Sequence, residues 1–297
     1  MMSKPIELVA AYWTISGDVY PFAENEISPF PFADRVEAAA KAGYKGVGLI
    51  HADLQATRGK IGLKEMRRIL DANGMPHVEL EFITHWFASG DLRAASDKVR
   101  RELFEAAEVL GARDVKIAPQ FDADGIDLPQ VTDSFAAICQ DAARYGTKIA
   151  LEVMPFSNVR TLETARAIVE GAAQPNGGLL LDIWHIGRGG IAYEAVAGIP
   201  KQYVVSVELD DADEAVVGTL WEDTIYERRL CGEGVLDPPA FIDAIRKTGF
   251  DSFYSVEVIS KRHRVLPLEE AARRSFETTM AQFSGNEGEA DGNQSQG

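Results

Sequence analysis

Residues 180–190 read Leu180-Leu181-Asp182-Ile183-Trp184-His185-Ile186-Gly187-Arg188-Gly189-Gly190. An apolar run thus ends in an acid, a histidine and a glycine-rich bend. Continuous apolar runs are typical of buried parallel strands, and α/β folds place their chemistry at the carboxyl ends of such strands. We therefore predict a strand over residues 178–182, with Asp182 and His185 as functional groups at its tip.

Seven other apolar runs alternate with stretches of helical periodicity. The predicted strands cover residues 6–12, 46–50, 77–83, 114–118, 148–153, 178–182, 203–209 and 253–258. Eight units of about 30 residues are the period and length of a single (β/α)8 TIM barrel in the α/β class. The main alternative is a doubly wound sheet, which the lack of G-x-G-x-x-G after the first strand disfavours. We expect a TIM-barrel catalytic domain over residues 1–283 and a disordered acidic tail over residues 284–297.

Composition excludes several classes of protein. The formal net charge of -16 over 297 residues argues against binding nucleic acid phosphates or anionic membranes. Two distant cysteines, Cys139 and Cys231, form no disulfide framework and no zinc-finger spacing. The chain has no signal-peptide pattern at its start and no apolar run of about 20 residues. A cytoplasmic protein that acts on a small molecule, with no nucleic acid or membrane partner, is expected.

Three more predicted strands carry an acid near their carboxyl ends: Glu152, Glu208 and Glu257. In a barrel these ends converge with that of Asp182 on one face. Like charges a few ångströms apart cost several kcal/mol at low effective dielectric, and a divalent cation removes that cost. Hard oxygen ligands suit Mg²⁺ or Mn²⁺. Asp210 shares a strand face with Glu208 and is the alternative inward acid.

Other residues are candidates for substrate binding around these acids. Arg229, or its neighbour Arg228, lies in a glycine-containing loop after the seventh strand and is placed to reach over the pocket. Aromatic residues near the start of the chain suit the apolar faces of sugars or rings. The alternatives to substrate binding are that the histidines are structural, that the two arginines are an exposed pair, and that the aromatic residues only pack within a loop. The further candidates are His51, His85, Lys116, His185 and Trp13.

Five motifs, taken in order, are shared with a known superfamily. They are L-E-V-M-P-F at 151–156, L-D-I-W-H at 181–185, V-E-L-D-D-A at 207–212, R-L-C-G-E-G at 229–234 and V-E-V at 256–258. The chain resembles the xylose-isomerase-like TIM-barrel superfamily, in its sugar phosphate isomerase/epimerase branch, over about residues 6–283. That branch includes ketose 3-epimerases and inosose dehydratases, and endonuclease IV is a cousin.

This resemblance implies a metal site and a set of roles. The ion would be Mn²⁺, with Mg²⁺ or Co²⁺ as alternatives, and its ligands would be Glu152, Asp182, Glu208 and Glu257. Glu152 and Glu257 would also exchange protons with the substrate, while His185 and Arg229 would bind its oxygens. Glu208 departs from the family, which usually has a neutral ligand there. Either a cation such as Lys116 or Arg229 compensates, or Glu208 is protonated or is not a ligand.

The implied activity is that of a divalent-metal-dependent isomerase or epimerase. It would act on a keto-sugar or related polyhydroxy carbonyl compound by proton abstraction through an enediolate. The alternative is a metal-dependent dehydratase of a cyclic polyol or hydroxy-acid ketone. More remote alternatives are an endonuclease IV-like phosphodiesterase, which five histidines and the acidic charge disfavour, and a non-catalytic subunit. Members of this branch form dimers or tetramers, so a homodimer or homotetramer is expected.

Overall fold

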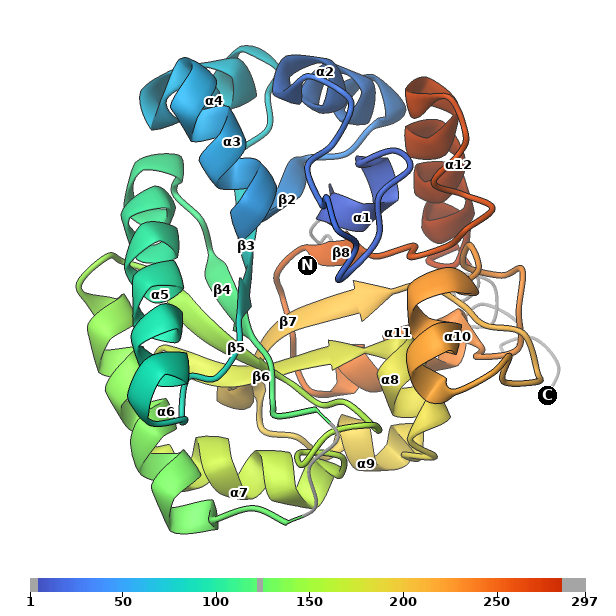
Figure 1. The fold of residues 1–297 in the computed structure, drawn as a ribbon. Helices are drawn as coiled ribbons and strands as arrows, with labels where there is room; N and C mark the ends of the chain where they lie inside the picture. Colours follow the sequence, from blue (N-terminus) through green and yellow to red (C-terminus); the bar gives the residue numbers. More distant parts are fainter. Residues whose placement is uncertain (1–4, 122–124, 285–297) are drawn as a thin grey trace, which may run out of the picture.

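Eight parallel strands form a closed barrel in the computed structural model, which describes residues 5–121 and 125–284 (Figure 1). Strand order follows the sequence, and β8 pairs with β1 to close the barrel. The predicted (β/α)8 barrel is confirmed. The strands are β1 (Leu8–Ala10), β2 (Gly46–Ile50), β3 (His77–Ile83), β4 (Asp114–Ile117), β5 (Lys148–Glu152), β6 (Gly177–Asp182), β7 (Val204–Leu209) and β8 (Tyr254–Val256).

Helices surround the barrel and connect its strands (Figure 1). None of those in the described part of the chain is long and apolar enough to cross a membrane. They are α1 (Tyr12–Ile15), α2 (Phe32–Ala42), α3 (His51–Ile61), α4 (Leu63–Ala72), α5 (Gly90–Leu110), α6 (Leu128–Ala143), α7 (Leu162–Ala172), α8 (Ile183–Arg188), α9 (Tyr193–Ala197), the 3₁₀ helix η1 (Lys201–Tyr203), α10 (Leu220–Tyr226), α11 (Pro238–Lys247) and α12 (Leu268–Ala281).

One predicted strand needs correction, and one helix was not predicted. The expected first strand over residues 6–12 is shorter, because the chain turns into the short helix α1 after β1. The unpredicted helix is α3, which meets α4 at Gly62, a glycine with a positive φ. α3 has little amphipathic periodicity, so its sequence gave no signal. The predicted tail at 284–297 lies outside the described residues apart from Ser284, and the domain division stays a prediction.

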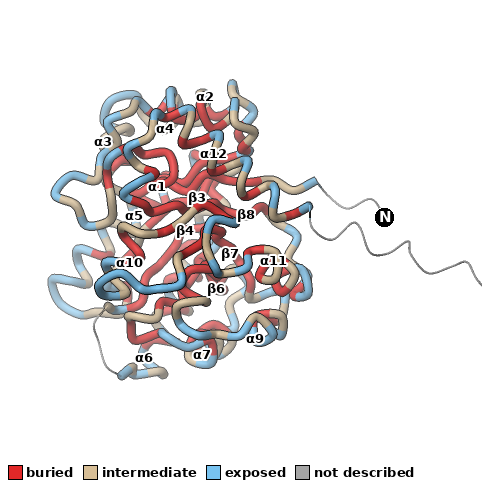
Figure 2. Tube along the Cα trace, turned by 90° about the vertical axis from the view of Figure 1, so that its right-hand side faces the viewer, coloured by how far each residue is buried: buried red, intermediate tan, exposed pale blue. Residues whose placement is uncertain are grey.

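The apolar core lies between the strands and the surrounding helices. Figure 2 shows buried residues along the strands and exposed residues on the outer loops and helices. Successive strand residues point to opposite faces, so apolar residues such as Leu80 and Val115 pack outward against the helices. Gly111 ends α5 in the left-handed conformation, which glycine adopts without a steric cost.

The barrel interior is unusually polar near its centre. Interiors of such barrels are generally filled by branched apolar side chains. Here Lys116 of β4 is fully buried, and its Nζ donates to Glu79 Oε1 of β3 at 3.0 Å and also to Glu208 of β7. Ser255 of β8 donates to the same Glu79 oxygen at 2.5 Å. This charged layer lies inside the barrel, next to the residues at the carboxyl ends of the strands.

The outer core should dominate stability. Phe135 of α6 is fully buried and packs against Gly177 of β6. We expect Phe135→Ala to lower the free energy of unfolding by about 3–5 kcal/mol, because it leaves a cavity in a closely packed layer. Chemical denaturation measures this change. Val265→Ala, at a residue that is 62% exposed, is the control and should change stability by less than about 0.5 kcal/mol. Equal losses in the two variants would contradict the assignment of the core.

Candidate active site

A cavity of about 270 Å³ opens at the carboxyl ends of the strands. Glu81, Glu152 and Glu257 line it from β3, from β5 and from just after β8. Apolar side chains supply most of the remaining wall. The aromatic residues among them are Trp13, Phe22, Phe82, Phe121, Phe156 and Trp221. The cavity therefore combines a carboxylate floor with an aromatic wall, an arrangement typical of small-molecule sites.

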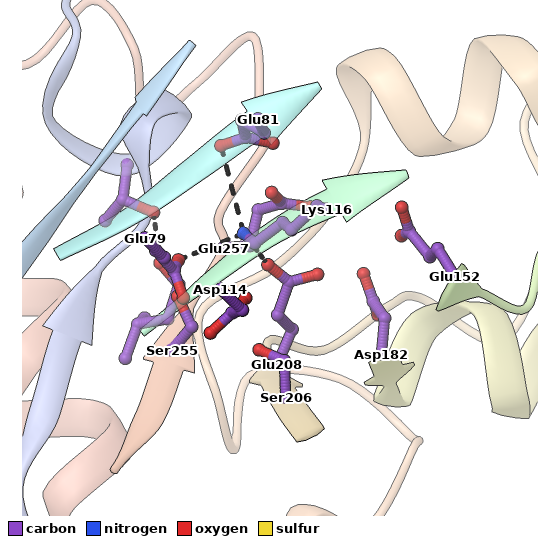
Figure 3. Close-up of polar contacts among 12 residues, drawn as sticks. Glu79, Glu81, Asp114, Lys116, Glu152, Asp182, Ser206, Glu208, Ser255 and Glu257 are labelled. Atoms are coloured by element: carbon purple, nitrogen blue, oxygen red, sulfur yellow. Dashed lines mark hydrogen bonds and ion pairs between the residues drawn. The ribbon is translucent and has the colours of Figure 1, made fainter. Parts of the chain in front are cut away.

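The four acids predicted as metal ligands gather at this end of the barrel. Possible ligand atoms of Asp182, Glu208 and Glu257 lie within 4.8 Å of one another, and those of Glu152, Asp182 and His185 do so as well. All five side chains are buried. Figure 3 shows Asp182 beside Glu208, with Glu152 beyond it. Asp182 thus belongs to both groups and joins them.

Asp182 has a structural role as well as a place in the cluster. It is the N-cap of α8, because its Oδ1 accepts a hydrogen bond from the Trp184 backbone N–H at 2.7 Å. Its other oxygen, Oδ2, accepts from Arg228 Nη1 at 2.6 Å. Burial alone would raise the pKa of Asp182, but the charges of Arg228 and His185 hold it below its usual value. Asp182 therefore stays ionised at neutral pH.

Arg228 lies in the middle of the acids. Its Nη1 lies 2.6 Å from Asp210 Oδ2 and 3.3 Å from Glu257 Oε2, in addition to the contact with Asp182. Its neighbour Arg229 points away and donates to Asp213. Neighbouring residues of an extended segment point to opposite sides, so only one of the two arginines can face the cavity. The structure gives that position to Arg228, and Arg229 does not line the cavity.

The other candidate residues divide into two groups. His185 and Trp13 line the cavity, and His185 Nε2 lies 3.0 Å from Glu152 Oε1. His51 also lines it and contacts Glu102 Oε2 through Nε2 at 2.6 Å. His85 is exposed, has a positive φ and does not line the cavity. Lys116 is not among the residues that line the cavity, although its Nζ lies 3.8 Å from the wall residue Glu81.

Lys116 is the cation nearest to Glu208. The pKa of Glu208 is raised well above its usual value by burial and by the charge of Glu257, while Lys116 acts in the opposite direction. Burial likewise raises the pKa of Glu257, and Arg228 opposes that shift. The two buried cations therefore offset the charge of the acids only in part.

These residues fit a divalent cation. Seven buried acids, namely the four candidate ligands, Asp210, Glu79 and Glu81, lie around only two buried cations, Lys116 and Arg228, in this part of the described structure. Carboxylates near one another are stable when protons or a metal ion balance their charge. Because the donors are hard oxygens with one nearby imidazole, the set suits a divalent ion of the Mg²⁺ or Mn²⁺ type.

Sequence reasoning missed Glu81 and most of the aromatic wall. Glu79 and Glu81 alternate with apolar residues in β3, and this period of two indicates that both face the barrel interior. That signal was present in the sequence. Phe121, Phe156 and Trp221 come from loops after β4 and β5 and from α10, whose positions no periodicity reveals.

Comparison with known proteins agrees with this architecture. The profile of the xylose isomerase-like TIM barrel family matches residues 36–281, and the chain belongs to this family. Inosose isomerase of Bacillus velezensis is 27% identical over 190 residues, which cover 62% of this chain and 67% of that protein. 3-Dehydroshikimate dehydratase of Pseudomonas aeruginosa is 25% identical over 237 residues, which cover 79% of this chain and 37% of that protein.

A solved structure extends the similarity of the fold. The IOLI protein, crystallised with a zinc atom, superposes with a TM-score of 0.77 at 21% identity and covers 94% of this chain and 98% of its own. The curated relatives are enzymes. The matched segment spans about two thirds of the isomerase and little more than a third of the dehydratase. Family membership is therefore shown, while the reaction is a separate question.

The two adjacent arginines provide a matched test of the site. We expect Arg228→Met to lower the free energy of unfolding of the chelator-treated protein by about 3–5 kcal/mol, because buried carboxylates lose their counter-ion. Arg229→Met removes a pair near the surface and should cost no more than about 1 kcal/mol. Denaturant unfolding at neutral pH measures both. Equal effects would contradict the central position of Arg228.

Proposed function

We propose that the protein is a divalent-metal-dependent enzyme that removes a proton next to the ketone of a cyclic polyhydroxy compound and isomerises it. One observation supports this most directly: Glu152, at the end of β5, and Glu257, just after β8, line the same aromatic-walled cavity near Asp182. Two carboxyl groups on either side of a substrate can remove a proton from carbon and return one. The similarity to inosose isomerases agrees with this reaction.

In this proposal Glu152, Asp182, Glu208 and Glu257 hold the metal ion. Manganese is the ion we propose, with Mg²⁺ or Co²⁺ as alternatives; the similar IOLI protein contains zinc. When bound, such an ion supplies a Lewis acid that stabilises negative charge on substrate oxygens. Glu152 and Glu257 carry protons to and from carbon, and His185 and Arg228 orient substrate oxygens. The aromatic wall excludes water from these charged groups.

A second candidate is dehydration of a hydroxylated ring ketone. Both reactions begin with loss of the same kind of proton, but dehydration continues with loss of a neighbouring hydroxyl group. The largely apolar wall favours this candidate, because it suits a flat ring with few hydroxyl groups. The match to 3-dehydroshikimate dehydratase also covers more of this chain than the match to inosose isomerase does.

We also propose that the protein acts on small molecules, without a nucleic acid or membrane partner, and assembles as a homodimer or homotetramer. The net charge of -16 supports the first part, because binding nucleic acid backbones requires basic surface. Size-exclusion chromatography with light scattering measures the assembly.

Metal removal in heavy water tests the proposed chemistry. An inosose and 3-dehydroshikimate are incubated in D₂O with the Mn²⁺-loaded protein and with the chelated protein. We expect the loaded protein to exchange the proton next to the ketone for deuterium, because Glu152 or Glu257 removes it. NMR follows this exchange, and mass spectrometry distinguishes an isomer from a product that has lost water. Full activity after chelation would contradict a metal role, and product without deuterium would contradict proton abstraction.

A substitution of Glu257 is the most direct single-residue test of the proposed mechanism. We expect Glu257→Gln to lower turnover by about 10²–10⁴-fold, the usual contribution of a positioned acid or base. Circular dichroism should show an intact fold, because glutamine preserves the size of the side chain. Glu277→Gln, on the exposed face of α12, is the control and should keep wild-type turnover. Wild-type turnover in Glu257→Gln would remove this residue from the mechanism.

A further inference from the structure

Glu81 is a third glutamate in the cavity wall, and the roles described so far leave it unused. It lies near the end of β3, is 6% exposed and lines the cavity beside Phe82 and Thr84. Its Oε1 has no hydrogen-bond partner among the described residues. An unpartnered polar atom buried beside a cavity is costly unless a ligand or water binds it. Its position therefore points to contact with whatever occupies the cavity.

The nearest cation does not fully engage Glu81. Lys116 Nζ lies 3.8 Å from Glu81 Oε1, beyond hydrogen-bond distance, whereas it donates to both Glu79 and Glu208. Figure 3 shows Glu81 on the opposite side of Lys116 from Glu208. Burial raises the pKa of Glu81 to about 7, although the Lys116 charge acts against this shift. Glu81 can therefore carry a proton at neutral pH and can also release it.

Glu81 is also separate from the groups that could hold a metal. Neither cluster of possible ligands includes it, and both clusters lie on β5 to β8. It thus faces the same cavity as Glu152 and Glu257 from a different part of the barrel. A group in this position can reach a substrate oxygen while the other two glutamates face substrate carbon.

We propose that Glu81 is a catalytic residue that moves protons between substrate oxygens, while Glu152 and Glu257 move the proton on carbon. This inference rests on the proposed function, because it needs a substrate with a ketone beside a hydroxyl group. Shifting a ketone along a ring requires two proton movements, one between carbons and one between oxygens. A carboxyl group suits the second, since one of its oxygens donates a proton while the other accepts one.

The isomerisation conserves protons and electrons. Glu152 or Glu257 removes the proton from the hydroxyl-bearing carbon, the C–H electron pair forms a C=C bond, and the carbonyl pair moves to its oxygen. Glu81 gives its proton to that oxygen and takes one from the neighbouring hydroxyl group. The pair released there forms the new C=O bond. The proton on the first glutamate exchanges with solvent, and the C=C pair then takes a proton from that glutamate at the former carbonyl carbon. Both glutamates end in their starting protonation states.

The same position serves dehydration. Removal of the carbon proton leaves its electron pair in an enolate. This pair forms the new C=C bond as the C=O bond re-forms, and the C–O bond to the leaving hydroxyl group breaks with its electron pair going to oxygen. Glu81 supplies the proton that turns this group into water, and it regains a proton from the protonated glutamate through solvent. In either reaction Glu81 acts on oxygen and not on carbon.

Glu81→Gln separates the two kinds of proton transfer. Glutamine keeps the size and neutral charge of a protonated glutamate, so the fold should persist, but it cannot pass a proton on. With the Mn²⁺-loaded protein and an inosose or 3-dehydroshikimate in D₂O, we expect deuterium exchange on carbon to stay near the wild-type rate. Product formation should fall by about 10²–10⁴-fold. Glu81→Asp keeps the acid and should recover part of the product formation.

Glu79→Gln is the matched control, because Glu79 lies two residues earlier on β3, contacts the same lysine and does not line the cavity. Its ratio of exchange to product should equal that of the wild type. Equal changes of this ratio in the two glutamine variants would overturn the role of Glu81 and indicate an effect through Lys116. Loss of exchange and product together in Glu81→Gln would also overturn it. Absence of exchange in the wild type would instead contradict the proposed function.

Discussion

Charge compensation inside the barrel is the constraint on which the site depends. Arg228 contacts Asp182, Asp210 and Glu257 in an upper layer, and Lys116 contacts Glu79 and Glu208 in a lower one. Burying such pairs brings little net stability, because desolvation offsets most of the Coulomb attraction. Their effect is to fix the positions of the carboxyl groups. The barrel interior is therefore less apolar than is usual, and two buried cations hold the carboxylate oxygens at the bottom of the cavity in place.

Much of this floor follows from the sequence, and the reason is periodicity. Glu152, Asp182, Glu208 and Glu257 each follow or interrupt an apolar run, and parallel strands of a barrel bring such positions to one face. Backbone geometry alone therefore predicts their approach. Glu81 carries the same signal, since V-E-L-E-F alternates apolar and acidic residues and so places Glu79 and Glu81 on one face of β3.

Outside the strands, where no periodicity marks the inward face, the sequence predicts the direction of a side chain less well. Arg228 and Arg229 have the same chemistry, and the choice between them depends on which side of the segment faces inward, which the pairing of Asp211 with Arg229 sets. His85 follows a strand as His185 does, yet it is exposed with a positive φ, whereas His185 lies on a helix capped by Asp182. The D-x-x-H spacing itself is that of a helix cap followed by its first turn. A residue after a strand joins the site only when the next element turns it inward.

The aromatic wall and the three carboxyl groups of Glu81, Glu152 and Glu257 together limit the reactions that the cavity can support. Apolar rings beside charged groups lower the local dielectric, which strengthens the electrostatic interactions among these groups. In the proposed reaction, two glutamates of the candidate metal site, Glu152 and Glu257, move the proton on carbon. The outcome then depends on the oxygens, because isomerisation and dehydration share the first step and differ in which oxygen receives a proton. The position of the group that donates a proton to oxygen therefore selects between the two reactions. Glu81 on β3 lies in a part of the cavity wall that contains none of the candidate metal ligands.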